Sequence, residues 1–215
     1  MEIRLDNKNA FVCGSTQGIG KAIAVHMAKS GANVVLVARN EDALRKVCDE
    51  LDTSRRQLHQ YIVADFSKPD ELKNRVDVFL KSYSPIHILV NNSGGPAGGA
   101  ITDASAETFI NTFQQHLICN QVLVQTVLSG MKKERYGRII NIISTSVKQP
   151  IRSLGVSNTI RGAVANWSKT LSVEVAPFGI TVNNLLPGAT KTQRLTSLVA
   201  NKAKQSGRSE EDVLK

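Results

Sequence analysis

Short β-branched runs alternate with longer amphipathic stretches along nearly the whole chain of 215 residues. A run that is apolar throughout, such as Asn-Val-Val-Leu-Val-Ala at 33–38, is typical of a strand buried on both faces of a parallel sheet. The alternation therefore predicts one α/β domain over 1–215, a Rossmann-like, doubly wound sheet in a three-layer α/β/α arrangement. The predicted strands are 9–13, 33–38, 61–64, 86–90, 138–143 and 180–186. The predicted helices are 18–30, 41–52, 106–132 and 158–176, with others opening at Pro69 and near Ser209.

The composition narrows the classes of partner. The net charge of +9 is spread over many segments and aromatic residues are only 5%, which favours anionic small molecules over nucleic acid. The densest basic cluster is Lys132, Lys133, Arg135 and Arg138. No apolar run approaches the ~20 residues of a membrane-spanning helix, so we expect no membrane partner and a cytoplasmic location. Three scattered cysteines, without metal-ligand spacing, are expected to be reduced thiols, and no metal site is predicted.

A glycine pattern follows the first predicted strand and opens the first predicted helix. In that context the first glycine permits a tight turn, and the others let the backbone approach a pyrophosphate at the positive end of the helix. The sequence therefore predicts a dinucleotide-binding turn. Its residues are Gly14, Ser15, Thr16, Gln17, Gly18, Ile19 and Gly20.

The end of the second predicted strand indicates which dinucleotide is bound. A free ribose 2′-hydroxyl is normally read by an acidic residue here, but this chain has Ala38, Arg39 and Asn40. A guanidinium pairs with a 2′-phosphate, so we predict NADP(H) rather than NAD(H), with Ser15 as a second donor to that phosphate. The alternative is that Arg39 is only an exposed residue at a strand end.

These residues, together with Asn91-Asn92-Ser93-Gly94, Asn183 and Pro187-Gly188, resemble short-chain dehydrogenase/reductases, most closely bacterial 3-oxoacyl-acyl-carrier-protein reductases. The resemblance implies that residues after the later strands also contact the cofactor. They are Asp65, Phe66, Asn91, Ser93, Gly94, Pro187, Gly188 and Thr192. The family's C-terminal helix and seventh strand are not expected within this sequence, and 193–215 is expected to cover the substrate.

The family's chemistry uses a serine, a tyrosine and a lysine four residues beyond the tyrosine. Ser144 matches the serine, but the family's spacing places Ser157 and Arg161 at the other two positions. An aliphatic hydroxyl is a far weaker acid than a tyrosine, whose reference pKa is ~10, so Ser157 cannot readily transfer the proton. The resemblance lets Arg161 hold the nicotinamide ribose and supply positive charge, although a fixed cation is a poor proton relay.

His116 falls at or next to the family's asparagine that organises a proton-relay water on the long helix. Histidine titrates near neutrality, so His116 is either a replacement acid or a histidine packed on the helix.

Two functions follow from the sequence. The first is an NADP(H)-dependent reductase of a carbonyl group, with 3-oxoacyl thioesters of fatty acid biosynthesis as one substrate class. Acyl carrier protein would then be a partner, facing the basic cluster around Arg135. The second is an NADP(H)-binding sensor or assembly partner with little or no catalysis. The resemblance also implies a homodimer through helices 106–132 and 158–176, with a homotetramer left open.

Overall fold

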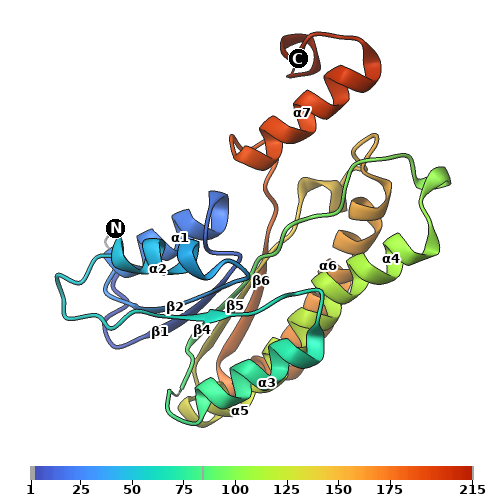
Figure 1. Ribbon diagram of the computed structural model, residues 1–215. Helices are drawn as coiled ribbons and strands as arrows, with labels where there is room; N and C mark the ends of the chain where they lie inside the picture. The colour runs from blue at the N-terminus through green and yellow to red at the C-terminus, as the bar shows by residue number, and fades with distance from the viewer. Residues whose placement is uncertain (1–2, 84, 215) are drawn as a thin grey trace.

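The computed structural model describes residues 3–83 and 85–214; Met1, Glu2, Ser84 and Lys215 of the predicted domain lie outside the described residues. Six parallel strands form one sheet in the order β3-β2-β1-β4-β5-β6 (Figure 1). Strand order reverses between β1 and β4, the point where ligands bind in open sheets of this kind. The predicted three-layer, doubly wound fold is confirmed, with strand ends shifted by one or two residues. The strands are β1 Asn9–Cys13, β2 Asn33–Ala38, β3 Gln60–Val63, β4 Ile88–Asn91, β5 Gly137–Ile142 and β6 Ile180–Leu185.

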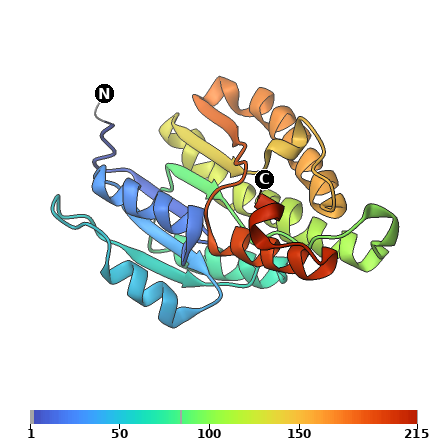
Figure 2. The same cartoon turned by 90° about the horizontal axis from the view of Figure 1, so that it is seen from above.

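Helices cover both faces of the sheet (Figures 1 and 2). The helices α1 Gly18–Lys29 and α2 Glu41–Asp49 pack on one face, where Ala24 and Leu44 join the buried core. On the other face lie α3 Pro69–Leu80, α5 Cys119–Glu134 and α6 Gly155–Val175. Local signals set their starts: Asn40 Oδ1 accepts the Ala43 N–H at 2.9 Å, and Pro69 occupies the first turn of α3.

The long helix predicted over 106–132 is interrupted in the structure. It consists of α4 Ala106–Phe113, a π-helical turn η2 over Gln114–Ile118, and α5. A π turn inserts one extra residue into the helical repeat, and such turns are frequent at functional sites. The turn carries His116, whose side chain is only 2% exposed.

The segment after β6 forms two helices above the carboxyl edge of the sheet (Figure 2). The helix α8 Glu210–Leu214 confirms the helix predicted near Ser209, whereas α7 Gln193–Ser206 was not predicted. Thr192 caps α7 by accepting the Leu195 N–H, and Gly207 ends it in the left-handed conformation at φ +66°. The helix was missed because polar residues dominate its sequence and hide a short apolar stripe.

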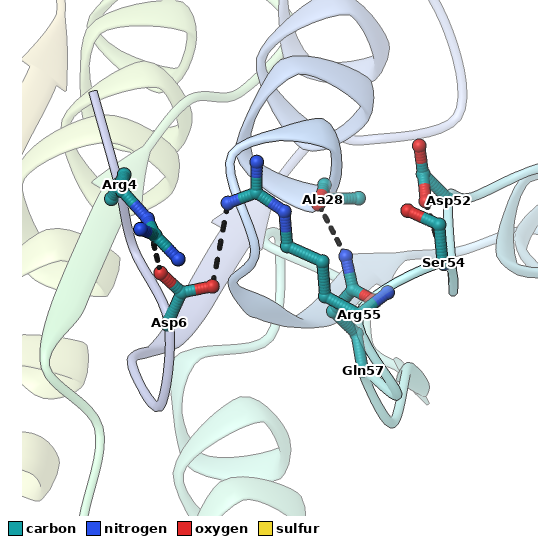
Figure 3. Close-up of polar contacts among 7 residues, drawn as sticks. All are labelled: Arg4, Asp6, Ala28, Asp52, Ser54, Arg55 and Gln57. Carbon is teal, nitrogen blue, oxygen red and sulfur yellow. Dashed lines mark hydrogen bonds and ion pairs between the residues drawn. The ribbon is translucent and has the colours of Figure 1, made fainter. Parts of the chain in front are cut away.

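A group of polar contacts around Asp6, Arg55 and Gln57 lies at the amino-terminal edge of the sheet (Figure 3). Asp6 pairs with Arg4 at 2.9 Å and with Arg55 at 3.4 Å, while Gln57 Nε2 donates to the Ala28 carbonyl at 2.7 Å. These contacts bind the loop before β3 to the end of α1. They stabilise the amino-terminal edge of the sheet and lie away from the carboxyl edge.

Three further observations concern membrane-spanning helices, metal sites and the cysteines. No helix in the described ranges is long and apolar enough to cross a membrane. Residues 3–83 and 85–214 contain no group of three or more His, Cys, Asp or Glu side chains that could hold a metal ion. Cys13, Cys48 and Cys119 are free thiols. Burial raises the pKa of Cys119 to about 12, so that thiol stays protonated near neutral pH.

Candidate functional site

Two adjoining cavities lie at the carboxyl edge of the sheet, beside the switch point between β1 and β4. The first cavity, of about 330 Å³, lies between the glycine turn and the ends of β2 and β3. The second cavity, of about 300 Å³, lies between the end of β5, α6 and α7. Their linings share Ile19, Asn92, Ser93 and Thr192, so they form one continuous depression.

The glycine turn is held by the end of β4. Asn92 Nδ2 donates to the Cys13 and Gly14 carbonyls at 3.2 Å each. Gly14 has φ +58°, and a Cβ on it would lie 2.7 Å from the Asn92 carbonyl oxygen. A Cβ on Gly20 would overlap the Gly14 carbonyl oxygen. Only glycine therefore lets the chain turn this tightly.

The turn exposes the amino end of α1 to the first cavity. Thr16, Gln17, Gly18 and Ile19 line that cavity, and the Gln17 side chain makes no capping hydrogen bond. The first N–H groups of a helix have no intrahelical acceptor, and the helix dipole adds positive potential there. The predicted turn is therefore shaped to bind an anion such as a pyrophosphate.

We expect Gly20→Ala to lower the free energy of unfolding by about 2–4 kcal/mol, because the added Cβ must displace backbone rather than a flexible side chain. NADPH affinity should fall with it, since the turn itself must move. Urea unfolding and NADPH fluorescence titration measure the two effects. Gly162→Ala in α6 is the control, because its Cβ meets nothing within 4 Å and alanine favours a helix. Equal stability of the two variants would contradict this description of the turn.

The far end of the first cavity combines a cation with a carboxylate. Arg39 and Asn40 line it after β2, and Asp65 and Phe66 line it after β3. Partial burial raises the pKa of Asp65, but hydrogen bonds from Ser67 and the positive charges of Arg39 and Lys68 outweigh this and lower it below its usual value. Asp65 is therefore ionised near neutral pH. The exposed guanidinium of Arg39 is placed to meet a phosphate at the cavity mouth.

The buried side chains of Ser15 and Asn91, both predicted cofactor residues, bond to other parts of the protein. Ser15 is fully buried and its Oγ accepts the Val37 N–H at 3.1 Å, so its predicted role as a phosphate donor is wrong. Asn91 is 2% exposed and donates to Asn141 Oδ1 at 2.8 Å. Asn141 in turn donates to Ser168 at 2.8 Å. This buried polar row links β4, β5 and α6, and any contact of Asn91 with a ligand must come through its backbone.

The second cavity brings the predicted catalytic serines and arginine together. Ser144, Ser157 and Arg161 line it with Pro187 and Gly188. Ser144 Oγ accepts the Ser146 N–H at 3.1 Å, which leaves its own hydrogen able to point towards a carbonyl oxygen. Arg161 Nη1 donates to the Ile142 carbonyl at 2.7 Å, which fixes a positive charge beside the cavity. The remaining wall is largely aliphatic: Ile142, Ile143, Ile151, Leu154, Leu195 and Leu198.

His116 does not line either cavity but reaches them through one neighbour. Its Nδ1 lies 2.8 Å from Ser93 Oγ, and Ser93 lines both cavities. Either atom can be the donor, depending on the tautomer and protonation of the imidazole. The π turn of η2 places His116 behind Ser93.

Some lining residues were not among those predicted. Asn92 was part of the quoted motif, and its role appears only when the end of β4 meets the glycine turn. Leu195 and Leu198 of α7 also line the second cavity. Their spacing of three residues, with Val199 next, is the helical signal that could have revealed them.

The basic cluster lies at the opposite edge of the sheet from both cavities. Arg138 is the second residue of β5, and its guanidinium carbon lies 4.2 Å from the centre of the Tyr136 ring. Arg135 donates to the Pro177 carbonyl at 3.0 Å. Lys132 lies 4.5 Å from the Phe178 ring. The cluster therefore does not border the cavities of its own chain.

Comparisons with known proteins agree with this geometry. Residues 8–203 match the family described as short chain dehydrogenase. The chain is 31% identical over 206 residues to the NADPH-dependent reductase BacG of Bacillus subtilis, covering 94% of this chain and 78% of that protein. It is similar to the structure of L-sorbose reductase from Gluconobacter frateurii complexed with NADPH and L-sorbose, with a TM-score of 0.89 and 29% identity, covering 99% of this chain and 81% of the other.

A third similarity is to the 3-ketoacyl-(acyl-carrier-protein) reductase from Brucella melitensis complexed with NADH. The TM-score is 0.81 and the identity 28%, covering 89% of this chain and 80% of the other. The family match includes the glycine turn, all six strands and most of the lining of both cavities. By sequence, fold and arrangement of the carboxyl edge, the chain belongs to the short-chain dehydrogenase/reductase family.

Proposed function

We propose that the protein is an NADP(H)-dependent oxidoreductase that reduces a carbonyl group to a secondary alcohol. The observation that carries the proposal is the pairing of the two cavities. The first has a helix amino end and Arg39 for the phosphates, and it opens directly onto the second, where Ser144 and Arg161 lie.

The residues of the first cavity fit the cofactor. The glycine turn, which has no room for a Cβ on Gly20, presents the amino end of α1 to a pyrophosphate, and Arg39 supplies the cation for a 2′-phosphate. Similar structures hold NADPH in one case and NADH in another, so the family fold alone does not select the cofactor. The choice of NADP(H) rests on Arg39. When bound, NADPH supplies the hydride and its two electrons for the carbonyl carbon.

The residues of the second cavity polarise the carbonyl group of the substrate. Ser144 donates a hydrogen bond to the carbonyl oxygen, which stabilises the negative charge that develops there. Arg161 holds the ribose hydroxyls and adds positive charge. Ser157 is a weak acid, so the proton that completes the alcohol comes from water or from His116.

The walls of the second cavity favour an apolar carbonyl compound. Aliphatic side chains from the end of β5, the loop before α6, and α7 surround the serines, and a 3-oxoacyl thioester is the substrate class we propose. The similar proteins act on different compounds, as the name L-sorbose reductase shows, so family membership does not select the substrate. The basic cluster does not border the cavities of its own chain. An acyl carrier protein docked on that cluster would therefore deliver its substrate to the cavities of another subunit.

The proposed assembly is a cytoplasmic homodimer. Apolar side chains are exposed on the predicted interface helices: Ile110 is 58%, Phe113 39% and Val173 73% exposed. A second copy of the chain would cover them. Light scattering that shows a monomer at micromolar concentration would contradict this assembly.

A second candidate function is an NADP(H)-binding sensor or assembly partner. Ser157 and Arg161 favour it, because neither can act as the family's tyrosine acid. Ser144, retained beside the second cavity, favours the enzyme.

NADPH fluorescence titration combined with NADPH oxidation tests the proposal. The substrates are an acetoacetyl thioester and a panel of aliphatic ketones. We expect binding and turnover with at least one substrate. Binding without turnover across the panel would support the sensor, and absence of binding would contradict both functions.

A further inference from the structure

The pair Ser93 and His116 is a polar contact that the family resemblance does not explain. The family motif has alanine where this chain has Ser93, and asparagine near the position of His116. Both departures occur in one chain, and the two side chains meet at 2.8 Å. The contact joins the loop after β4 to the π turn between α4 and α5.

His116 and Ser93 differ in how deeply their side chains are buried. His116 is 2% exposed and lies behind the cavity wall, whereas the half-buried Ser93 lines both cavities. The second cavity also contains Ser144, Ser157 and Arg161. A proton held on His116 therefore reaches the cavity by way of the Ser93 hydroxyl.

We propose that Ser93 and His116 form a proton relay that replaces the family's tyrosine acid, and this rests on the proposed reductase function. In the imidazolium form, Nδ1–H donates to Ser93 Oγ, so the serine hydrogen points into the cavity. The carbonyl oxygen takes that proton while the carbonyl carbon gains the hydride. Ser93 Oγ recovers a proton from Nδ1, leaving a neutral imidazole that takes up the next proton from water in the cavity, again by way of Ser93. One proton is consumed for each hydride.

The surroundings of the relay contain few groups that compete for the proton. The turn η2 packs against α3, α4, α5 and α6. Arg161 of α6 is a fixed cation bonded to the Ile142 carbonyl, and Cys119 of α5 is a neutral thiol whose pKa burial raises to about 12. The helices packed against the turn carry Glu107 in the first turn of α4, and Asp70 and Glu71 in the first turn of α3, where Glu71 pairs with Arg75. Asp65 interacts with Cys119.

The test uses Ser93→Ala, His116→Asn and the double variant in the full chain. A general acid contributes about 10²–10⁴-fold in rate, so each single variant should lose about 10²-fold in kcat. Because His116 does not line the first cavity, His116→Asn should keep NADPH affinity within about twofold of the parent. Residues that act in series are not additive, so the double variant should lose no more than either single one. Ser93→Thr keeps the hydroxyl and should retain most of the rate.

Two readouts separate the relay from a structural role. In the parent, kcat for reduction should fall as pH rises and His116 loses its proton, whereas His116→Asn should not show this titration. In the cofactor-free protein, Ser93→Ala should shift the His116 ring resonances in NMR spectra. Thr112→Val is the control, because it removes a buried hydroxyl of α4 that donates within its own helix, to the Thr108 carbonyl. It should change neither readout.

The outcomes distinguish the relay from the reductase. If the parent reduces ketones but Ser93→Ala and His116→Asn keep its rate and pH profile, the relay is wrong and the reductase stands. An unchanged His116 resonance in Ser93→Ala also overturns the relay. If the parent binds NADPH but reduces nothing, the proposed function fails and the relay fails with it.

Discussion

The double substitution Ser157→Tyr with Arg161→Lys is expected to raise the rate of NADPH-dependent ketone reduction by about 10²-fold, the lower end of what general acid–base catalysis supplies. A phenol is a far stronger acid than a serine hydroxyl, and a neighbouring ammonium lowers its pKa further towards working pH. Ser157 already lines the second cavity, whose volume of about 300 Å³ gives a tyrosine ring space to enter. Single-turnover and steady-state NADPH oxidation measure the gain.

The matched control is Ser157→Phe with Arg161→Lys, which adds the same bulk without the phenol. Only the tyrosine variant should gain activity. The tyrosine would also relieve the dependence on His116, so adding His116→Asn should cost much less than in the parent. If the tyrosine variant binds NADPH as well as the parent but turns over no faster than the phenylalanine variant, the transfer of the family's active site to this chain is wrong.

Replacing Arg39 with alanine should weaken NADPH binding by about 10- to 100-fold and leave NADH binding within about twofold. Hydrogen bonds to charged groups contribute about 1.5–3 kcal/mol, and each 1.4 kcal/mol is a factor of ten in affinity. NADH has no 2′-phosphate, so it has nothing to lose at this position. Fluorescence titration of both nucleotides measures the two affinities.

Arg45→Ala is the control for a general loss of positive charge. Arg45 is also exposed, but it lies on α2 near Glu41 and does not line the first cavity. It should leave both affinities unchanged. Equal losses of NADPH affinity in Arg39→Ala and Arg45→Ala would mean that net charge, rather than a specific contact, attracts the cofactor.

The parts that sequence predicted correctly are those that local chemistry determines. Continuous apolar runs are typical of strands buried on two faces, and their alternation with helices predicts a parallel sheet with helices on both faces. The glycine pattern and Arg39 can be recognised from their immediate neighbours in the sequence, and Gly14, Gly18 and Arg39 line the first cavity. The Asn92 side chain that holds the turn comes from a distant segment.

The parts that sequence missed depend on contacts between distant segments. Whether Ser15 faces the cavity or the sheet is decided by the Val37 N–H, which lies 22 residues further along the chain. The π turn that buries His116 against Ser93 changes one repeat within an otherwise regular helix, and hydrophobic periodicity does not resolve a single inserted residue. In α7, Lys, Ser and Thr obscure the apolar stripe that faces the second cavity.

The most direct test is parallel titration of the parent protein with NADPH and NADH at one ionic strength. The helix end after β1 should bind the pyrophosphate that both nucleotides share, and the Arg39 guanidinium after β2 should make NADPH bind at least about tenfold more tightly than NADH. If the two nucleotides bind equally, or neither binds, the assignment of the first cavity to NADP(H) is contradicted.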